Sequence, residues 1–336
     1  MIPAMRVAVL GAGSWGTTVA TLVAGRHDCT LWARDPELAR EIDERDANSR
    51  YLPGFTLPAS LRATADLEKA VHDVDLLVVG VPTRGFRAIL IDAKPYMRPW
   101  IPVVSLSKGF ESGSLLRMTQ VIQEVLPGHP AAALTGPNLA KEIMAGQAAA
   151  SVIATEDPAV AKALQAVLQR GLFRIYTNHD LVGCELGGAL KNVVAIATGI
   201  AQGLSVGDNT RAAVITRGLA ELTRLGVAMG GEARTLAGLA GMGDLIATCM
   251  SPLSRNRTLG EQLGAGKTLE EVLSATRTVA EGVGTAFTAH ELAQRYGVEM
   301  PVCTEVYRVL AGEIPASEAY RGLLRLQRAG HESEPG

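Results

Sequence analysis

Three glycines near the start of the chain have the spacing of a phosphate-binding turn. Gly11, Gly13 and Gly16 follow the apolar run 6–10 in the pattern Gly-x-Gly-x-x-Gly, and a helical segment comes next. The first glycine permits a tight turn, the second lets the backbone approach a pyrophosphate, and the third lets the helix pack on the strand. Free N–H groups at the start of that helix would face the anion. The pattern therefore predicts a dinucleotide site.

Polar residues flank this turn at two points. Ser14 and Trp15 occupy the first turn of the predicted helix, where we expect both to contact the cofactor. Arg34 and Asp35 follow the apolar run 29–32, at the distance where the ribose of the adenosine half is held. Asp35 could accept from the 2′-OH of NAD, and Arg34 could hold the 2′-phosphate of NADP, so either cofactor fits. Alternatively, Asp35 caps the helix that follows it.

A hydroxyl, a guanidinium and an amide follow one another at Ser254, Arg255 and Asn256. Arginine offers paired hydrogen bonds that match phosphate oxygens, so this segment predicts an anion cradle. A helix start with Ser254 as its cap is the alternative, and the two are compatible. Lys108 follows the apolar run 101–106, at the carboxyl edge where doubly wound sheets bind ligands, although a surface turn would also explain it.

The order of apolar runs and helical segments predicts two domains. Runs at 6–10, 29–32, 75–81, 101–106 and 131–134 alternate with amphipathic segments at 17–24, 36–46 and 115–126. Strands alternating with helices imply a parallel sheet covered on both faces. Two more strands are expected at 148–154 and 172–176, with a helix near 159–169 between them. We expect an α/β fold: a Rossmann-type NAD(P)-binding domain with a doubly wound sheet over 1–180, then an all-helical substrate-binding and catalytic domain over 181–330.

Helix start signals support the second domain. Asp208 or Asn209 is expected to cap a helix that runs through Leu225, and residues 268–271 form a capping box. A further helix is expected over 184–200, which would place Lys191 and two small residues, Gly187 and Ala195, on one face.

Composition limits the other possibilities. The formal net charge is −2 and aromatic residues make up 4%, which argues against nucleic acid as a partner. The four cysteines have no metal-site or redox-pair spacing, so we expect no metal. We see no signal peptide and no membrane span, and therefore expect a cytoplasmic protein. A homodimer is expected because symmetric dimers are the commonest oligomers.

The chain resembles the bacterial NAD(P)-dependent glycerol-3-phosphate dehydrogenases. The shared motifs stand in family order between about residues 5 and 315, at 11–16 (GAGSWG), 51–54 (YLPG), 81–83 (VPT), 107–109 (SKG), 135–138 (TGPN), 185–192 (ELGGALKN), 207–209 (GDN), 241–244 (GMGD), 254–256 (SRN) and 279–282 (VAEG). The resemblance implies reversible hydride transfer between NAD(P)H and dihydroxyacetone phosphate, giving sn-glycerol 3-phosphate for glycerophospholipid synthesis. It also implies a cleft between the two domains.

The resemblance gives the second domain its chemistry. It makes Lys191 the general acid and base, and it makes Asp244 a partner of Lys191 or of the substrate. It assigns residues 254–256 to the glycerol phosphate, with Arg255 near the cofactor as well. Without the family, a lone lysine is more often a surface charge, and Asp244 could be a helix cap. Asn192 could orient the substrate or Lys191, or could join two helices.

Further contacts follow from the same resemblance. Lys108 is expected against both substrate and cofactor. Asn138 departs from the Ser or Thr that is commoner in the family, but an amide can still donate and accept. Glu281 could instead be a solvated helix-end charge. The remaining implied contacts are Gly136 for the substrate, and Arg34, Tyr51, Ala140, Val279 and Glu281 for the cofactor.

The sequence leaves two alternatives open. One is another enzyme of this architecture, such as a hydroxyacid or ketopantoate-type reductase, which also has a central lysine. The cradle at 254–256 favours a phosphorylated substrate instead. The other is a regulator that binds NAD(P) without turnover, which would need neither Lys191 nor the cradle. The fold class alone cannot separate them.

Overall fold

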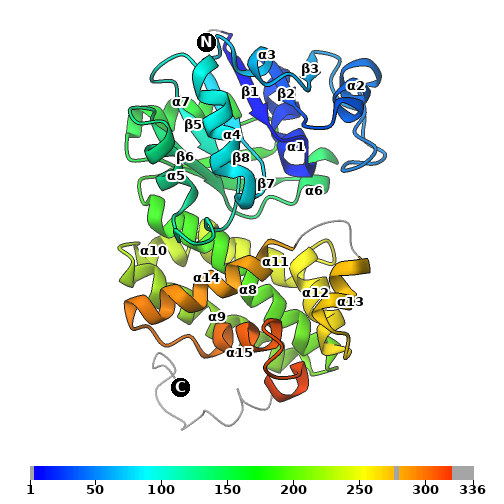
Figure 1. Cartoon of the computed structure of the whole chain (residues 1–336), viewed down its shortest axis with the longest axis vertical. Coiled ribbons are helices and arrows are strands. Elements are labelled where there is room, and N and C mark those ends of the chain that lie inside the picture. Colours follow the sequence, from blue (N-terminus) through cyan, green and yellow to red (C-terminus); the bar gives the residue numbers. More distant parts are fainter. Residues whose placement is uncertain (1–3, 276–279, 320–336) are drawn as a thin grey trace. The chain divides into compact units, whose positions relative to one another are not determined.

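The computed structural model describes residues 4–275 and 280–319. The chain divides into two compact units, Met1–Leu181 (unit 1) and Val182–Gly336 (unit 2), which Figure 1 colours along the sequence. Each unit has its own architecture and is described separately.

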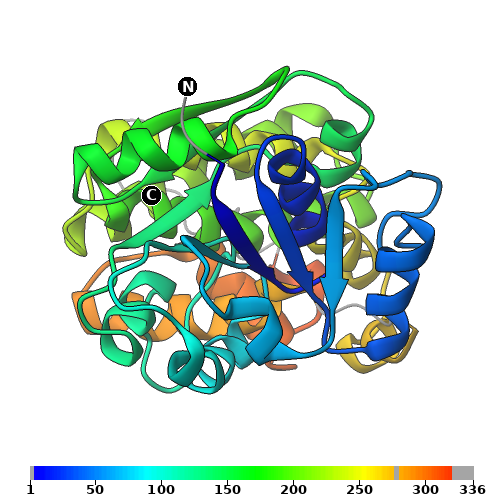
Figure 2. The ribbon, with the colours of Figure 1, turned by 90° about the horizontal axis from the view of Figure 1, so that it is seen from above.

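Unit 1 is a twisted eight-stranded sheet in the order β3-β2-β1-β4-β5-β6-β7-β8 (Figure 2). All neighbouring strands are parallel except β6 and β7, which are antiparallel. The chain reverses its strand order between β1 and β4, and in such sheets ligands bind beyond the carboxyl ends at that point. The strands are β1 Arg6–Leu10, β2 Asp28–Trp32, β3 Leu61–Thr64, β4 Leu76–Val79, β5 Val103–Ser105, β6 Ala131–Thr135, β7 Ala149–Ala154 and β8 Phe173–Asn178.

Helices cover both faces of this sheet, because successive side chains of a strand point to opposite faces. Val7 and Val9 of β1 pack in the core that contains α1 and α7 residues, whereas Ala8 and Leu10 pack in the core that contains α4 and α5 residues. The predicted doubly wound α/β fold is therefore confirmed. The helices are α1 Ser14–Ala24, α2 Pro36–Arg45, α3 Leu67–Val71, α4 Phe86–Ala93, α5 Met118–Val125, α6 Ala140–Met144 and α7 Pro158–Leu168.

The structure of unit 1 adds to the predicted elements and changes one of them in detail. β3, α3 and α4 were not predicted at all. The predicted helix over 115–126 begins only at Met118, because Leu115 has a left-handed φ of +61° that does not continue into a helix. The strands predicted to form a parallel sheet pair in parallel, whereas the further strand β7 is antiparallel to β6, a direction that its apolar run does not indicate.

Unit 2 is helical in its described residues and is built around α8, Leu181–Gly203 (Figure 1). By length and composition this helix could span a membrane, yet 94% of its apolar window is buried, as in the core helix of a globular protein. A bent pair, 233–250 and 255–264, also passes that test, with a 51° break. The other helices are α9 Asp208–Ala228, α10 Ala233–Leu236, α11 Asp244–Met250, α12 Arg255–Gly264, α13 Leu269–Ala275, α14 Glu281–Tyr296 and α15 Pro301–Leu310.

The helix start signals of unit 2 had different outcomes. The predicted capping box is confirmed, because Glu271 accepts from the Thr268 N–H at 2.8 Å and the Thr268 hydroxyl accepts from the Glu271 N–H at 3.2 Å. The predicted Asp208 or Asn209 cap is wrong. Gly207 is the N-cap of α9 and no side chain caps it, and the helix continues to Ala228 rather than Leu225.

Small residues let α8 and α12 cross at close range. A Cβ added at Gly260 would lie 2.1 Å from the Ile196 carbonyl oxygen, so the two backbones touch where only glycine fits. The same close approach occurs on the other side of α8, where a Cβ at Gly187 would lie 2.5 Å from the Ala240 oxygen. These contacts pack α12 and the segment before α11 against α8, on either side of Lys191 in the sequence.

Candidate active site

The glycine turn of unit 1 has the backbone geometry of an anion site. Gly11 has a φ of +109°, and a Cβ at Gly16 would lie 2.0 Å from the Gly11 oxygen. A Cβ at Gly13 would meet no atom within 4 Å, which leaves open space beside the start of α1. Gly13 is the N-cap of that helix, with no side-chain cap and no acidic residue in the first turn. Its N–H groups can therefore receive a pyrophosphate, and the residues fit a dinucleotide.

Ser14 and Trp15 lie in that first turn. The Ser14 carbonyl accepts from the Thr18 hydroxyl at 2.8 Å. The Trp15 ring packs edge-on against Phe173 with ring centres 6.0 Å apart, and its buried Nε1 has no partner among the described residues. Cofactor contact at both residues stays a prediction.

The loop that contains Tyr51 is fastened to the glycine turn by a residue that sequence reasoning missed. Asn48 is fully buried, and its amide donates to the Ala12 carbonyl and the Thr17 hydroxyl, each at 2.9 Å. Its oxygen accepts from the Tyr51 N–H at 3.1 Å. Tyr51 therefore lies close to the predicted cofactor turn. An asparagine in a loop gave no signal for this role.

Asp35 is engaged at both carboxylate oxygens. Oδ1 caps α2 by accepting from the Glu37 N–H at 3.0 Å, so the helix cap that the sequence allowed is present. Oδ2 forms an ion pair with Arg50 at 2.8 Å. The Arg50 hydrogen bond, followed by the Glu37 N–H, lowers the pKa of Asp35. Sequence reasoning missed Arg50. The neighbouring Arg34 is exposed.

Three predicted ligand-binding residues come together at the carboxyl edge of the sheet. The Lys108 amine, just past β5, donates to the Gly136 carbonyl at 3.0 Å and to Asn138 Oδ1 at 2.8 Å, both just past β6. The Asn138 amide nitrogen is buried and has no partner among the described residues. Buried N–H donors are normally satisfied, so this one suits an acceptor supplied by a ligand. Ala140 begins the adjacent helix α6.

A salt bridge that was also missed holds the Lys108 loop. Arg87 of α4 donates from Nε and Nη2 to the two Glu111 oxygens, each at 2.8 Å, and Nη2 also donates to Glu124 at 2.7 Å. The Arg87 hydrogen bond lowers the pKa of Glu111. A bidentate pair of this kind fixes orientation, and it does so three residues beyond Lys108.

The amine of Lys191 is buried in unit 2 and is paired there. Its side chain is 8% exposed, and Nζ forms an ion pair with Asp244 Oδ1. Nζ also donates to the Thr248 hydroxyl at 2.7 Å, and that hydroxyl donates to the Asp244 carbonyl at 2.7 Å. An ammonium group has three donors, so one remains after these two partners among the described residues. The arrangement can present one N–H to a ligand oxygen.

Thr248 was not predicted from the sequence. It stands four residues after Asp244 on α11, so both side chains share a helix face, and this spacing is the signal that could have identified it. Cys249 lies next to it and is buried, and burial raises the pKa of its thiol to about 11. A thiol that remains protonated suits the structural role expected for the cysteines rather than a nucleophilic one.

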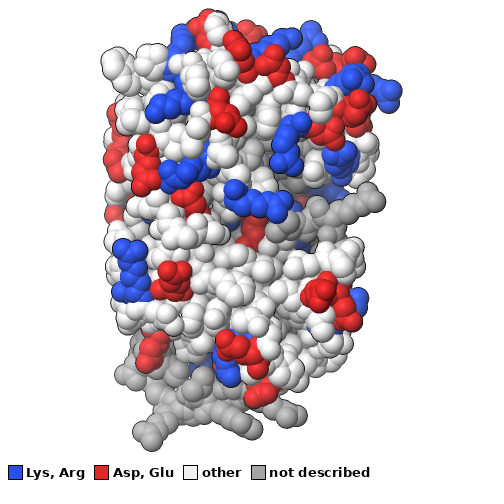
Figure 3. All heavy atoms as spheres, in the orientation of Figure 1, with Lys and Arg blue, Asp and Glu red and all other residues white. Residues whose placement is uncertain are grey.

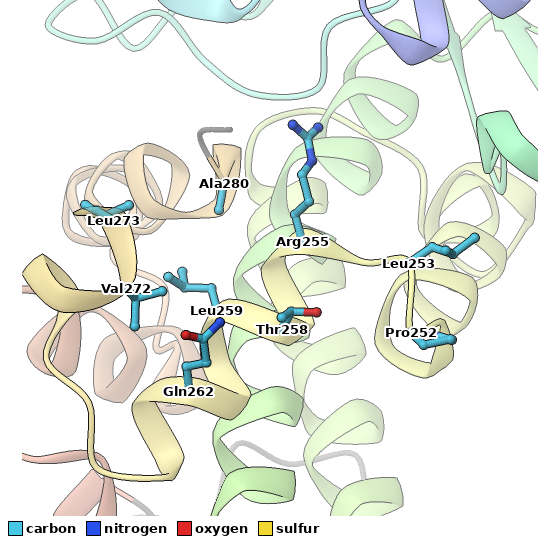
Figure 4. Close-up of a pocket in the computed structure, with 9 residues that line it drawn as sticks. All are labelled: Pro252, Leu253, Arg255, Thr258, Leu259, Gln262, Val272, Leu273 and Ala280. Carbon is cyan, nitrogen blue, oxygen red and sulfur yellow. The ribbon is translucent and has the colours of Figure 1, made fainter. Parts of the chain in front are cut away.

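The predicted anion cradle begins α12. The Ser254 hydroxyl accepts from the Arg257 N–H at 3.3 Å and is the N-cap of the helix. Arg255 is exposed and lies beside a cavity of about 210 Å³ lined mainly by apolar side chains. In Figure 4 the Arg255 side chain extends away from α12, clear of Leu259 and Gln262. Arg257 is committed elsewhere, to the Ser251 carbonyl at 3.0 Å and to Gln202.

Asn256 connects three helices. Its amide donates to Asn192 Oδ1 of α8 at 2.9 Å, and its oxygen accepts from the Gly282 N–H of α14 at 3.0 Å. Asn192 thus has the helix-joining contact that the sequence left open. Glu281, a predicted cofactor contact, is the first residue of α14. The other contact predicted nearby, Val279, lies outside the described residues.

The described residues were also compared with metal sites and with nucleic-acid-binding surfaces. Among residues 4–275 and 280–319, no group of three His, Cys, Asp or Glu side chains could hold a metal. On the face drawn in Figure 3, Lys and Arg side chains stand among Asp and Glu side chains. The described surface in that view therefore shows mixed charge rather than the basic stripe typical of nucleic-acid binding.

Comparison with known proteins covers both units. The family model for the NAD-dependent glycerol-3-phosphate dehydrogenase N-terminus matches residues 6–161, and the one for the C-terminus matches residues 180–321. The chain is 54% identical to glycerol-3-phosphate dehydrogenase [NAD(P)+] 2 of Sphingopyxis alaskensis, with 99% of each chain covered. It is 50% identical to glycerol-3-phosphate dehydrogenase [NAD(P)+] 1 of Mycobacterium tuberculosis, with 97% of this chain and 96% of that protein covered.

Solved structures are also similar. The glycerol-3-phosphate dehydrogenase of Coxiella burnetii has a TM-score of 0.91 at 37% identity, covering 96% of this chain and 99% of that one. A ketopantoate reductase of Ralstonia eutropha has a TM-score of 0.61 at 17% identity, covering 94% of this chain and 100% of that one. At that identity the second likeness concerns the fold alone.

Proposed function

The chain belongs to the NAD-dependent glycerol-3-phosphate dehydrogenase family, and we propose that Lys191 is the proton-transfer group of its reaction. It is an NAD(P)-dependent oxidoreductase that interconverts dihydroxyacetone phosphate and sn-glycerol 3-phosphate. The product is a precursor for glycerophospholipid synthesis. The observation that carries the proposal is the buried amine of Lys191, paired with Asp244 and Thr248 and left with one donor.

Unit 1 holds the cofactor in this proposal. The backbone of Gly11, Gly13 and Gly16 receives the pyrophosphate, since the turn leaves open space at Gly13. When bound, NADH or NADPH supplies the hydride, and the oxidised cofactor accepts it in the reverse direction. Further cofactor contacts are proposed at Ser14, Trp15, Arg34, Tyr51, Lys108, Ala140, Arg255, Val279 and Glu281.

Lys191 moves the proton that accompanies the hydride. Reduction adds a hydride to the ketone carbon and a proton to its oxygen, so a donor must reach that oxygen. The ammonium group of Lys191 supplies this proton, and in oxidation the neutral amine removes it. Asp244 and Thr248 hold Nζ in one position and limit its rotamers. The reacting oxygen then meets a pre-oriented N–H.

The substrate phosphate is assigned to positively charged and amide groups. Arg255 supplies the guanidinium, which suits a phosphate dianion, beside Ser254 and Asn256. Because Asn256 already joins Asn192 and Gly282, only its second amide hydrogen is left for a ligand. Substrate contacts are proposed at Lys108, Gly136, Asn138, Lys191, Asp244, Ser254, Arg255 and Asn256.

We also propose a cytoplasmic homodimer. The four cysteines are free and buried, which suits a reducing compartment. Size-exclusion chromatography with light scattering tests the dimer directly.

Initial rates test the reaction. Oxidation of NADH or NADPH is followed with dihydroxyacetone phosphate, and an unphosphorylated keto acid serves as the matched comparison. We expect turnover with the phosphorylated ketone and little with the keto acid. Lys191→Met should lower kcat by about 10²–10⁴-fold while cofactor binding is kept. Unchanged turnover in this variant, with the fold intact by circular dichroism, would remove Lys191 from the mechanism.

A further inference from the structure

At the adenosine end of the proposed cofactor site, the carboxylate of Asp35 already has two protein partners. In NAD-binding sheets of this type, a carboxylate after β2 accepts from the ribose hydroxyls. Here Asp35 stands in that place, but Oδ1 accepts from the Glu37 N–H at 3.0 Å and Oδ2 is paired with Arg50 at 2.8 Å. Each oxygen keeps a second lone pair, so a ribose hydroxyl would share this carboxylate with Arg50, which already neutralises its charge.

One guanidinium group, of Arg34, belongs to the residue before Asp35, and another, of Arg50, contacts its carboxylate. Arg34 directly precedes Asp35 in the chain and is exposed, with no ion pair among the described residues. Arg50 contacts Asp35, and its side chain is still 55% exposed. Arg50 also interacts electrostatically with Glu41, so these two arginines stand against two carboxylates. A 2′-phosphate dianion is attracted by the exposed guanidinium groups themselves, whereas a 2′-hydroxyl gains little from them.

The Arg50 backbone is held at a defined distance from the cofactor turn. Asn48 precedes Arg50 in the loop and Tyr51 follows it. The Asn48 side chain donates to the Ala12 carbonyl and accepts from the Tyr51 N–H. Glu41 of α2 accepts from the Ser49 N–H at 2.9 Å. Because these bonds tie residues 48–51 both to the glycine turn and to α2, the Arg50 backbone is held beside the proposed cofactor site. A freely mobile surface arginine would lack such anchors.

We propose that Arg50, together with Arg34, binds the 2′-phosphate of NADP(H) and sets a preference for NADPH over NADH. Arg50 acts in two ways. Its guanidinium fork supplies paired hydrogen bonds to the phosphate. It also neutralises Asp35, whose charge would otherwise repel that phosphate, and it competes with the 2′-hydroxyl of NADH for Oδ2. This inference rests on the proposed cofactor site in unit 1 but not on the proton transfer at Lys191.

Ligand binding without turnover tests the proposal. Isothermal titration calorimetry on the cofactor-free protein compares adenosine 2′,5′-bisphosphate with adenosine 5′-monophosphate, which differ only in the 2′-phosphate. We expect the bisphosphate to bind at least tenfold more tightly. Arg50→Ala should reduce this ratio at least fivefold. Arg45→Ala removes an exposed arginine from the far end of α2 and should leave the ratio unchanged. Equal binding of the two probes, or a ratio that Arg50→Ala does not move, overturns the proposal.

A second variant separates the two possible roles of Asp35. Asp35→Asn should strengthen binding of the bisphosphate, because it removes the repelling charge and releases Arg50. If Asp35 were instead the ribose ligand of an NADH-preferring enzyme, Asp35→Asn would weaken NADH binding and leave the bisphosphate unchanged, which contradicts the proposal. The ratio of kcat/KM for NADPH to that for NADH should fall at least tenfold in Arg50→Ala.

The failures of the two proposals look different. Selective binding of the bisphosphate without turnover of dihydroxyacetone phosphate would refute the reaction but support the role of Arg50. Turnover with equal use of NADH and NADPH would refute the role of Arg50 and leave the reaction intact. No binding of either probe or of either cofactor would refute the cofactor site, and the role of Arg50 with it.

Discussion

The two units build their candidate sites by opposite means. In unit 1 the glycine turn is made of backbone, and its shape depends on missing side chains, because a Cβ at Gly16 would lie 2.0 Å from the Gly11 oxygen. In unit 2 the site is made of side chains on α8 and α11, with Lys191, Asp244 and Thr248 bonded to one another in the interior. The first site has no room for an added atom at Gly11 or Gly16. We expect the second site to depend on every one of its side-chain partners.

This difference has an energetic counterpart. N–H groups at a helix start are unsatisfied until an anion arrives, so the unit 1 site is completed by its ligand. A buried ion pair is different, because two charges removed from water must satisfy each other, and loss of one leaves the other uncompensated. The unit 2 site is therefore largely satisfied before any ligand binds. We therefore expect unit 1 to supply most of the affinity for the cofactor. We expect unit 2 to supply a proton-transfer group that is already held in position.

Removal of the charge at Asp244 is the strongest test of the comparison. Asp244→Asn keeps the shape but leaves the buried amine without a counter-ion, so kcat should fall by about 10²–10⁴-fold. Breaking a buried pair should also lower the free energy of unfolding by about 3–5 kcal/mol. Because Asp244 lies in unit 2, the dissociation constant for adenosine 5′-monophosphate should not change. Steady-state kinetics, urea unfolding and calorimetry measure the three quantities.

The matched control is Asp208→Asn. Asp208 is also in the first turn of a unit 2 helix and also pairs with a basic residue, Arg211, but its side chain is 87% exposed. It should leave kcat unchanged, since an exposed pair contributes little. Equal kcat values for wild type and Asp244→Asn would mean that the buried pair is only structural.

An added methyl group tests the backbone-built site. Gly16→Ala places a Cβ 2.0 Å from the Gly11 oxygen, so the turn must open. Overpacking of this kind costs about 1–3 kcal/mol, which corresponds to roughly a 5- to 150-fold loss of cofactor affinity if the turn is what binds it. Gly85→Ala is the control, because a Cβ there meets no atom within 4 Å. Wild-type affinity for NADPH in Gly16→Ala would show that the cofactor does not use this turn.

The same contrast explains what the sequence could predict. The doubly wound sheet was predictable because buried parallel strands are continuous apolar runs, and the glycine turn because its three residues are neighbours in the chain. β3 was missed because this edge strand has only one fully buried residue, Leu61, in its four. The antiparallel direction of β7 was missed because the apolar run 148–154 would look the same in either direction.

The unit 2 site was less accessible to sequence reasoning. Lys191 and Asp244 are 53 positions apart, and nothing local in the chain indicates that they pair. Only the resemblance to a known family singled out Lys191, and it did not include Thr248. The pairing of Asp35 with Arg50 was hidden for the same reason, since this ion pair joins a helix start to a separate loop. Backbone-built sites are local in sequence, and side-chain networks are not.

The smallest expected difference between the units is in how the free energy of unfolding depends on acid pH. Asp75 lies at the amino edge of the unit 1 sheet, accepts from the Arg6 N–H at 2.7 Å and pairs with Arg98. The hydrogen bond from the Arg6 N–H lowers the pKa of Asp75 below its ordinary value of 3.8, and the Arg98 guanidinium lowers it further. In unit 2, burial instead raises the pKa of Glu221, although it accepts from the Val302 N–H at 2.7 Å. The two carboxylates therefore have opposite linkage to pH.

Asp75→Asn should remove a stabilisation that depends on the ionised carboxylate. Because the folded pKa lies below the unfolded one, this stabilisation is fully present above about pH 4 and is lost as the pH falls through the folded value. The pair is partly exposed, so the difference at pH 7 should be below about 1 kcal/mol. Urea unfolding from pH 7 to pH 3 should show wild type and variant converging in acid, with the exposed Asp92→Asn as the charge-matched control. A difference that stays constant across this range would mean that Asp75 contributes by packing rather than by charge.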